Sequence, residues 1–465
     1  MKYKSILLIL ILAVLFACEP KTDDFSPTKG DADFTTYLAI GNSLTAGYTD
    51  GALYTSGQKY SYPNILATQL KTVGMQGEFK QTLIETENGV GVVNTAAGPY
   101  FLTKFILNYS TDCLGTTSVG PVRAVLNPDQ ATLAGELTKS VASQGPFNNI
   151  GIPSLKSTHV LFPGYGELNP YYGRFAENPK TDAVIGEFVK IDYTFFTLWL
   201  GNNDILLYAV SGGEGDSITP MAGTPGYGFA ASMDAVITSL TGNGAKGAIA
   251  NIPDITDIPY FTTVPYNALA LPNEELVKQL NDGYAEYNAT MEALGLDYRI
   301  SFQLGPNALV IADPTMPVPA VLQFRQIKST EYVLLSLPQD SLKCAGWGSQ
   351  KPIPGSYILD DTEIGLIETA RTDYNIKIKD LAFVHDIVLV DMESYLQELK
   401  DGMDFDGIHF SSEFVSGNGF SLDGIHFTPQ GNAIIANYFI DKINGAYNAN
   451  IPKVSISDYP NVQFP

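Results

Sequence analysis

Residues that can carry out acyl-transfer chemistry stand at three glycine-containing turns of this chain. Ser43 lies in a Gly-Asn-Ser-Leu-Thr-Ala-Gly turn and Asn203 in a Gly-Asn-Asn-Asp turn, each directly after an apolar segment. Asp423 precedes His426 by three positions, with a glycine between them. A serine hydroxyl becomes a nucleophile when a base takes its proton, a carboxylate orients that base and hydrogen-bond donors stabilise the oxyanion. These residue types therefore predict nucleophilic serine chemistry if the fold brings the turns together.

The general base must be one of only four histidines. His409 and His426 are each the fourth residue of an Asp-Gly-Ile-His-Phe sequence, in which the aspartate can bond one ring nitrogen and leave the other free. The second copy is followed at once by a Thr-Pro start of a helical pattern, whereas the first copy has no such supporting element. We therefore expect His426 with Asp423 to act, rather than His409 with Asp406.

Four short stretches resemble the sequence blocks that mark the SGNH, or GDSL-like, hydrolase family. In chain order they are GNSLTAG at 41–47, NIGIPS at 149–154, GNND at 201–204 and DGIH at 423–426. The resemblance implies that Ser43, His426 and Asp423 form a catalytic triad. It also implies a flavodoxin-like α/β/α sandwich with one central parallel sheet.

The same resemblance implies where the oxyanion of the reaction is held. The donors are the backbone N–H groups of Ser43 and Ser154 and the side-chain amide of Asn203, with Gly201 in the same turn as Asn203. Ser154 stands where the family has glycine, so its role requires that this turn tolerate a Cβ atom.

An alternation of strand and helix patterns leads independently to a parallel sheet covered by helices within residues 33–447. Apolar runs typical of buried strands lie at 34–40, 192–200, 247–252 and 387–390. Helical patterns lie at 62–73, 124–137, 229–240, 361–381 and 429–445.

Three regions depart from this alternation. Residues 145–173 are rich in Gly, Pro, Asn and Tyr and are expected to form a long functional loop. Residues 253–355 contain many prolines and one helical pattern at 273–294. We expect this segment to be an insertion or lid over the carboxyl edge of the sheet, because it has no evident core pattern; a separate small domain is the alternative. Residues 448–465 are expected to be an extended tail.

The start of the chain has the pattern of a lipoprotein signal. Lysines precede an apolar run at 6–16 that is too short to span a bilayer, which is typical of a secretory signal over residues 1–17. The run ends in Leu-Phe-Ala-Cys, which resembles a bacterial lipobox with Cys18 as the lipidated residue. Residues 18–32 then form a polar tether. We expect an exported protein anchored in the bacterial cell envelope, at the outer membrane.

Composition and charge restrict the partners. A formal net charge of −22 argues against nucleic acid, since phosphate binding needs a basic surface. An exported protein can keep a disulfide, but nothing local pairs Cys113 with Cys344, so both states stay open. No clustered His and Cys pattern suggests a metal site, and the expected chemistry requires no metal and no organic cofactor.

The function expected is that of an exported serine esterase. Its substrate stays open between a small-molecule or lipid ester, cleaved by an acylhydrolase, and a glycan ester, cleaved by a carbohydrate O-deacetylase. A second class of function is a non-catalytic lipoprotein that uses the same scaffold to bind glycan or lipid.

Overall fold

A five-stranded parallel β-sheet organises the main body of the computed structural model, which describes residues 25–95 and 98–465. Its strand order is β15-β8-β7-β1-β6 and every pairing is parallel. The strands are β1 (Tyr37–Gly41), β6 (Asn149–Gly151), β7 (Phe195–Trp199), β8 (Lys246–Ala250) and β15 (Val388–Val390). All five strands therefore end at the same edge of the sheet. The strand order reverses at β1, because β6 lies on one side of it and the later strands β7, β8 and β15 lie on the other. Open α/β sheets bind ligands at such switch points.

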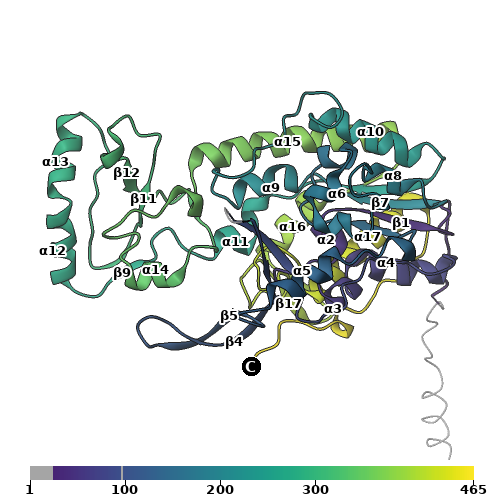
Figure 1. Cartoon of the computed structure of the whole chain (residues 1–465), viewed down its shortest axis with the longest axis horizontal. Helices are drawn as coiled ribbons and strands as arrows, with labels where there is room; N and C mark the ends of the chain where they lie inside the picture. The colour runs from purple at the N-terminus through teal and green to yellow at the C-terminus, as the bar shows by residue number, and fades with distance from the viewer. Residues whose placement is uncertain (1–24, 96–97) are drawn as a thin grey trace, which may run out of the picture.

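Helices cover the sheet above and below as it is seen in Figure 1. On one side lie α10 (Phe229–Thr241) and α15 (Asp361–Val384), and on the other α4 (Tyr62–Leu70) and α17 (Pro429–Tyr447). Local sequence explains where they begin: α4 has a proline in its first turn, α15 begins with a capping box, and α17 begins with a threonine cap and a proline. The molecule is thus a mixed α/β protein with a central parallel sheet between helices.

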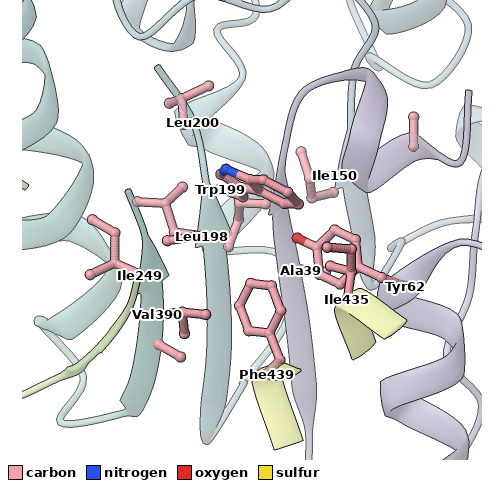
Figure 2. Packing of buried hydrophobic residues seen from close by; sticks show 14 of the residues in the cluster. Ala39, Tyr62, Ile150, Leu198, Trp199, Leu200, Ile249, Val390, Ile435 and Phe439 are labelled. Carbon is pink, nitrogen blue, oxygen red and sulfur yellow. The ribbon is translucent and has the colours of Figure 1, made fainter. Parts of the chain in front are cut away.

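The carboxyl end of β7 is fixed by aromatic packing. Trp199 is fully buried, and its ring centroid lies 5.8 Å from that of Tyr62 in α4 and 6.3 Å from that of Phe439 in α17 (Figure 2). Large rings packed at native density leave little freedom to move. The turn that follows β7 and carries Asn203 therefore begins from a rigid base.

Two expectations about the first half of the chain were wrong. Residues 145–173 are not all loop, because β6 pairs with β1 as an edge strand of the sheet. At three residues this strand is too short to show a periodic pattern. The helix expected at 124–137 begins only at α5 (Gln130–Thr138), since Pro128 precedes the Asp129 cap. The preceding residues form an unanticipated hairpin of β4 (Phe105–Thr111) and β5 (Thr117–Arg123).

Most of the segment at 253–355 forms a lobe with hydrophobic clusters of its own, a core that the sequence pattern did not indicate. One cluster includes Tyr287, Met291 and Ile300, and another includes Leu309, Val333 and Ile353. The helix expected at 273–294 is two helices, α12 (Glu274–Gly283) and α13 (Ala285–Ala293), separated at a non-helical Tyr284. The lobe projects to one side of the sheet (Figure 1).

A disulfide joins the hairpin to this lobe. Cys113 lies in the turn between β4 and β5, and Cys344 ends α14 (Gln339–Cys344). The Lys343 ammonium lies 2.8 Å from the Asp112 carboxylate beside the bridge. The two protruding parts of the molecule are therefore tied to each other.

We expect the double variant Cys113→Ser/Cys344→Ser to be less stable, with faster amide exchange in the hairpin and the lobe. The bridge joins residues 231 positions apart, and bridges over long loops contribute about 2–4 kcal/mol. Calorimetry with and without a reductant measures the effect, and the double variant is the control that a reductant should not change. A wild-type Tm that ignores the reductant would contradict this prediction.

Within the described residues, no helix is long and apolar enough to cross a membrane. The expected signal at 1–17 and the expected lipidation at Cys18 lie outside the described residues, as does much of the tether at 18–32.

Candidate active site

Ser43 stands on a sharp turn at the end of the central strand β1. Strand β1 ends at Gly41, where a Cβ atom would lie 2.5 Å from the Trp199 carbonyl oxygen, so the close approach to β7 requires glycine. Helix α2 (Ser43–Ala46) follows at once, with the Asn42 side chain accepting a hydrogen bond from the Leu44 N–H at 3.0 Å. Ser43 is the first residue of this short helix, so its own N–H has no acceptor within the helix. The turn thus places a hydroxyl and an N–H that helix α2 leaves without an acceptor together at the sheet's carboxyl edge.

A continuous hydrogen-bonded chain joins Ser43, His426 and Asp423. The His426 Nε2 atom lies 2.8 Å from the Ser43 Oγ atom, and the His426 Nδ1 atom lies 2.8 Å from an Asp423 carboxylate oxygen. Ser43 is 9% exposed and His426 is 8% exposed, so water has little access to these bonds. Ser43 follows strand β1, and its two partners come from the turn before α17.

Asp423 is held as an anion by its surroundings. Burial by itself would raise its pKa, but the neighbouring His426 and the hydrogen bonds it accepts hold the pKa well below the ordinary range. The backbone N–H groups of Ile425 and His426 donate to one oxygen at 2.9 Å, and that of Gly51 donates to the other at 2.7 Å. An anionic Asp423 favours the His426 tautomer with its proton on Nδ1, which leaves the Nε2 lone pair for the Ser43 hydroxyl.

The loop after α2 supports the Asp423 turn from the side. Asp50, in the left-handed region at φ 52°, accepts hydrogen bonds from the Leu422 N–H at 3.0 Å and the Tyr54 hydroxyl at 2.6 Å. Its own N–H donates to the Ser421 hydroxyl, which donates in turn to Asp423 at 3.0 Å. Burial raises the pKa of Asp50. Sequence reasoning missed Asp50 because its contacts join segments that lie far apart in the chain.

The Tyr48 ring is a second contact that sequence reasoning missed. It packs against the His426 imidazole with ring centroids 4.8 Å apart, while its hydroxyl donates to the Gly51 carbonyl at 2.8 Å. Tyr48 therefore restricts the orientation of the histidine ring. The residue lies five positions after Ser43, and nothing in its local sequence marks it.

Asn203 lies beside Ser43 at the start of α9 (Asn203–Ala209). Its side-chain Nδ2 atom donates one hydrogen to the Leu155 carbonyl at 3.1 Å, which fixes the amide and leaves its second hydrogen for another acceptor. The neighbouring Asp204 is fully buried and accepts hydrogen bonds from the Ser157 hydroxyl at 2.6 Å and the Ser157 N–H at 2.9 Å. Asp204 therefore ties the loop after β6 to the turn after β7.

Ser154 and Gly201 are not brought to the wall of the pocket beside Ser43. Ser154 is exposed and adopts the left-handed region at φ 63°, and Gly201 has φ 113°. A serine fits the turn because its side chain points away from the packed interior. Ser154 adjoins Leu155, whose carbonyl holds Asn203, so its loop supports the site even though Ser154 does not line it.

A narrow pocket opens beside the Ser43 hydroxyl. Its volume is about 40 Å³, and its wall includes Ser43, Asn203 and His426. The remaining wall is mainly apolar and includes Leu44, Leu206, Ile255, Ile258, Leu396 and Phe420. The described polar atoms Trp199 Nε1 and Asn202 Oδ1 belong to residues of the same wall and are buried without a hydrogen-bond partner. Pro253, Ile255 and Ile258 come from the start of the expected insertion, whereas no residue of 259–355 lines this pocket.

The remaining histidines do not join this arrangement. His409 is exposed on β17 (Ile408–Phe410) and its Nδ1 atom lies 2.9 Å from Asp404, while Asp406 of its own repeat accepts a bond from the Ile456 N–H. His159 accepts a hydrogen bond from the Lys156 N–H, and burial lowers its pKa to about 4. In residues 25–95 and 98–465, no group of three or more His, Cys, Asp or Glu is placed to hold a metal ion.

The fold and the site together define a mixed α/β protein with a Ser-His-Asp chain at the carboxyl edge of its parallel sheet. No protein-family model matches the sequence, and no curated protein matches it.

Replacing Ser154 by glycine is expected to raise the free energy of unfolding by up to about 1 kcal/mol. A Cβ in the left-handed region costs roughly 1–2 kcal/mol, and the greater freedom of glycine in the unfolded chain offsets part of the gain. Urea denaturation of Ser154→Gly and of the control Ser154→Ala, which keeps the Cβ, measures the effect. A glycine variant less stable than the alanine variant would contradict the prediction.

Proposed function

We propose that this protein is an exported, lipid-anchored serine esterase of the SGNH or GDSL type. The observation that carries the proposal is the chain of 2.8 Å contacts from the Ser43 hydroxyl through His426 to Asp423. The envelope location and the anchor at Cys18 rest on the sequence pattern of residues 1–18 alone.

In the proposed reaction, the Ser43 Oγ atom attacks the ester carbonyl carbon while His426 Nε2 takes the hydroxyl proton. The carbonyl oxygen becomes an oxyanion, which accepts hydrogen bonds from the Ser43 N–H and the free amide hydrogen of Asn203. His426 then gives its proton to the alcohol oxygen as the C–O bond breaks, leaving an acyl group on Ser43.

Water then releases the acyl group from Ser43, and His426 again acts first as a base and then as an acid. His426 takes a proton from the water as its oxygen bonds to the acyl carbon, and returns that proton to Ser43 Oγ as the acyl bond breaks. Asp423 stays ionised and stabilises the imidazolium in both halves. The backbone N–H of Ser154 is a third proposed donor.

Two alternatives differ in what the site acts on. A carbohydrate O-deacetylase would use the same residues on a glycan ester. A non-catalytic lipoprotein would bind glycan or lipid without cleaving it, but the buried, ionised Asp423 behind His426 gives no advantage to mere binding.

Labelling by a fluorophosphonate, together with hydrolysis of p-nitrophenyl acetate, tests the proposal. We expect peptide mass spectrometry to place the label on Ser43, and Ser43→Ala to lose both labelling and ester hydrolysis. Ser411→Ala is the control for a buried serine outside the site. A wild-type protein that neither reacts with the probe nor hydrolyses esters would favour the binding lipoprotein.

A further inference from the structure

The pocket beside Ser43 restricts the acyl group. We infer that the protein removes short, uncharged acyl groups, acetyl or propionyl, from a larger alcohol that stays outside the pocket; this inference rests on the proposed esterase function. Its basis is the size, the wall and the charge of the pocket.

The size of the pocket limits what can enter it. A volume of about 40 Å³ leaves room for only a few groups the size of a methyl group or a water molecule. An acetyl group, with its carbonyl carbon, oxygen and methyl, fills this space. A long acyl chain, a sugar ring or a glycerol backbone would have to extend out of this space. The small acyl part of an ester must therefore enter, and the alcohol must lie toward solvent.

The wall cannot easily move outward. Ile255, Ile258, Leu396 and Phe420 are 3%, 8%, 7% and 4% exposed and belong to the main hydrophobic cluster around the sheet. Interiors at this density resist added volume, and overpacking costs about 1–3 kcal/mol. Leu206 of α9 differs from these four because it is only half-buried, so it can be shortened with less damage than they can.

The chemistry of the wall restricts the acyl group further. None of the residues that line the pocket is Asp, Glu, Lys or Arg, so an acyl group with its own charge would enter without a partner. The polar residues at the pocket are Ser43 and His426, Asn42 in the turn after β1, and Trp199, Asn202 and Asn203 at the end of β7 and in the turn after it, and none of them carries a full side-chain charge of the Asp, Glu, Lys or Arg kind. An uncharged aliphatic acyl group meets these conditions.

A series of p-nitrophenyl acetate, butyrate, hexanoate and octanoate tests the inference on the wild-type protein. We expect kcat/KM to be highest for acetate and to fall at least tenfold by hexanoate, because each excluded methylene is worth about 10-fold or more in a fitted pocket. Leu206→Ala should raise hexanoate hydrolysis relative to acetate by about 10-fold. Leu207→Ala, on the same helix but outside the pocket wall, is the matched control and should keep the wild-type ratio.

The outcomes separate the two proposals. Equal or better hydrolysis of octanoate by the wild type, with labelling of Ser43 intact, overturns the short-acyl inference and leaves the esterase standing. If Leu206→Ala leaves the ratio of hexanoate to acetate hydrolysis unchanged, the short-acyl inference is also overturned, because the pocket would then not hold the acyl group. Absence of both ester hydrolysis and Ser43 labelling overturns the esterase itself, and the inference with it.

Discussion

Replacing His426 by alanine is expected to lower kcat/KM for p-nitrophenyl acetate by about 10⁴-fold or more, as removal of the base does in known serine hydrolases. His409→Ala, in the other Asp-Gly-Ile-His-Phe copy, should leave the rate close to that of the wild type. The reason is geometric: His426 lies 2.8 Å from the nucleophile, whereas His409 is an exposed residue paired with Asp404. Initial rates of nitrophenol release at pH 7.5 measure both variants.

Loss of the imidazole also removes a partner of the buried Asp423 carboxylate, which destabilises the fold as well as the chemistry. His426→Gln separates the two effects, since its amide can still donate to Asp423 but cannot act as a base. We expect this variant to melt close to the wild type and to be as inactive as His426→Ala. Comparable loss of activity in His409→Ala would contradict the assignment of the base.

Much of the sheet could be predicted from sequence because its strands are short apolar runs buried on both faces. The runs at 192–200 and 247–252 became β7 and β8, and the run before Ser43 became β1. Because β1 and β7 are parallel, the serine turn after β1 and the asparagine turn after β7 lie at the same edge of the sheet. The choice between two identical pentapeptides rested on a physical argument, that a reactive pair needs a rigid element behind it, and the structure places a helix directly after His426.

The features that sequence reasoning missed depend on contacts between distant segments. Strand β6 is recognisable only as a partner of β1, because its three residues carry no pattern alone. The bridge between Cys113 and Cys344 requires the hairpin and the lobe to meet. One cluster of the lobe includes the helical pattern at 273–294, but the rest of the lobe's core comes from short segments separated by prolines, which are too brief to show periodicity. Asp50 contacts Leu422 across most of the chain, which no local spacing could indicate.

Asp423→Asn is expected to lower kcat by about 10⁴-fold while leaving the substrate pocket intact, as the same change does in trypsin-like enzymes. An asparagine amide that donates to His426 Nδ1 would favour the tautomer with its proton on Nε2, and that nitrogen could no longer accept from Ser43. Asp406→Asn, the matched change in the first repeat, should keep wild-type activity because Asp406 bonds the tail backbone at Ile456 instead. An Asp423→Asn variant within tenfold of the wild type would remove Asp423 from the proposed triad.

The pH dependence of stability gives Asp423 a second, independent test. Its pKa in the folded protein lies below the value of about 3.9 expected in the unfolded chain, so the unfolded state binds its proton first as pH falls. The stabilisation by this carboxylate is therefore complete above about pH 4 and is lost as pH falls toward the lower folded pKa. The difference in unfolding free energy between wild type and Asp423→Asn should accordingly be constant near neutral pH and shrink below about pH 4. A difference that stays constant into strong acid would mean that Asp423 is not held as an anion, and the tautomer argument for His426 would fall with it.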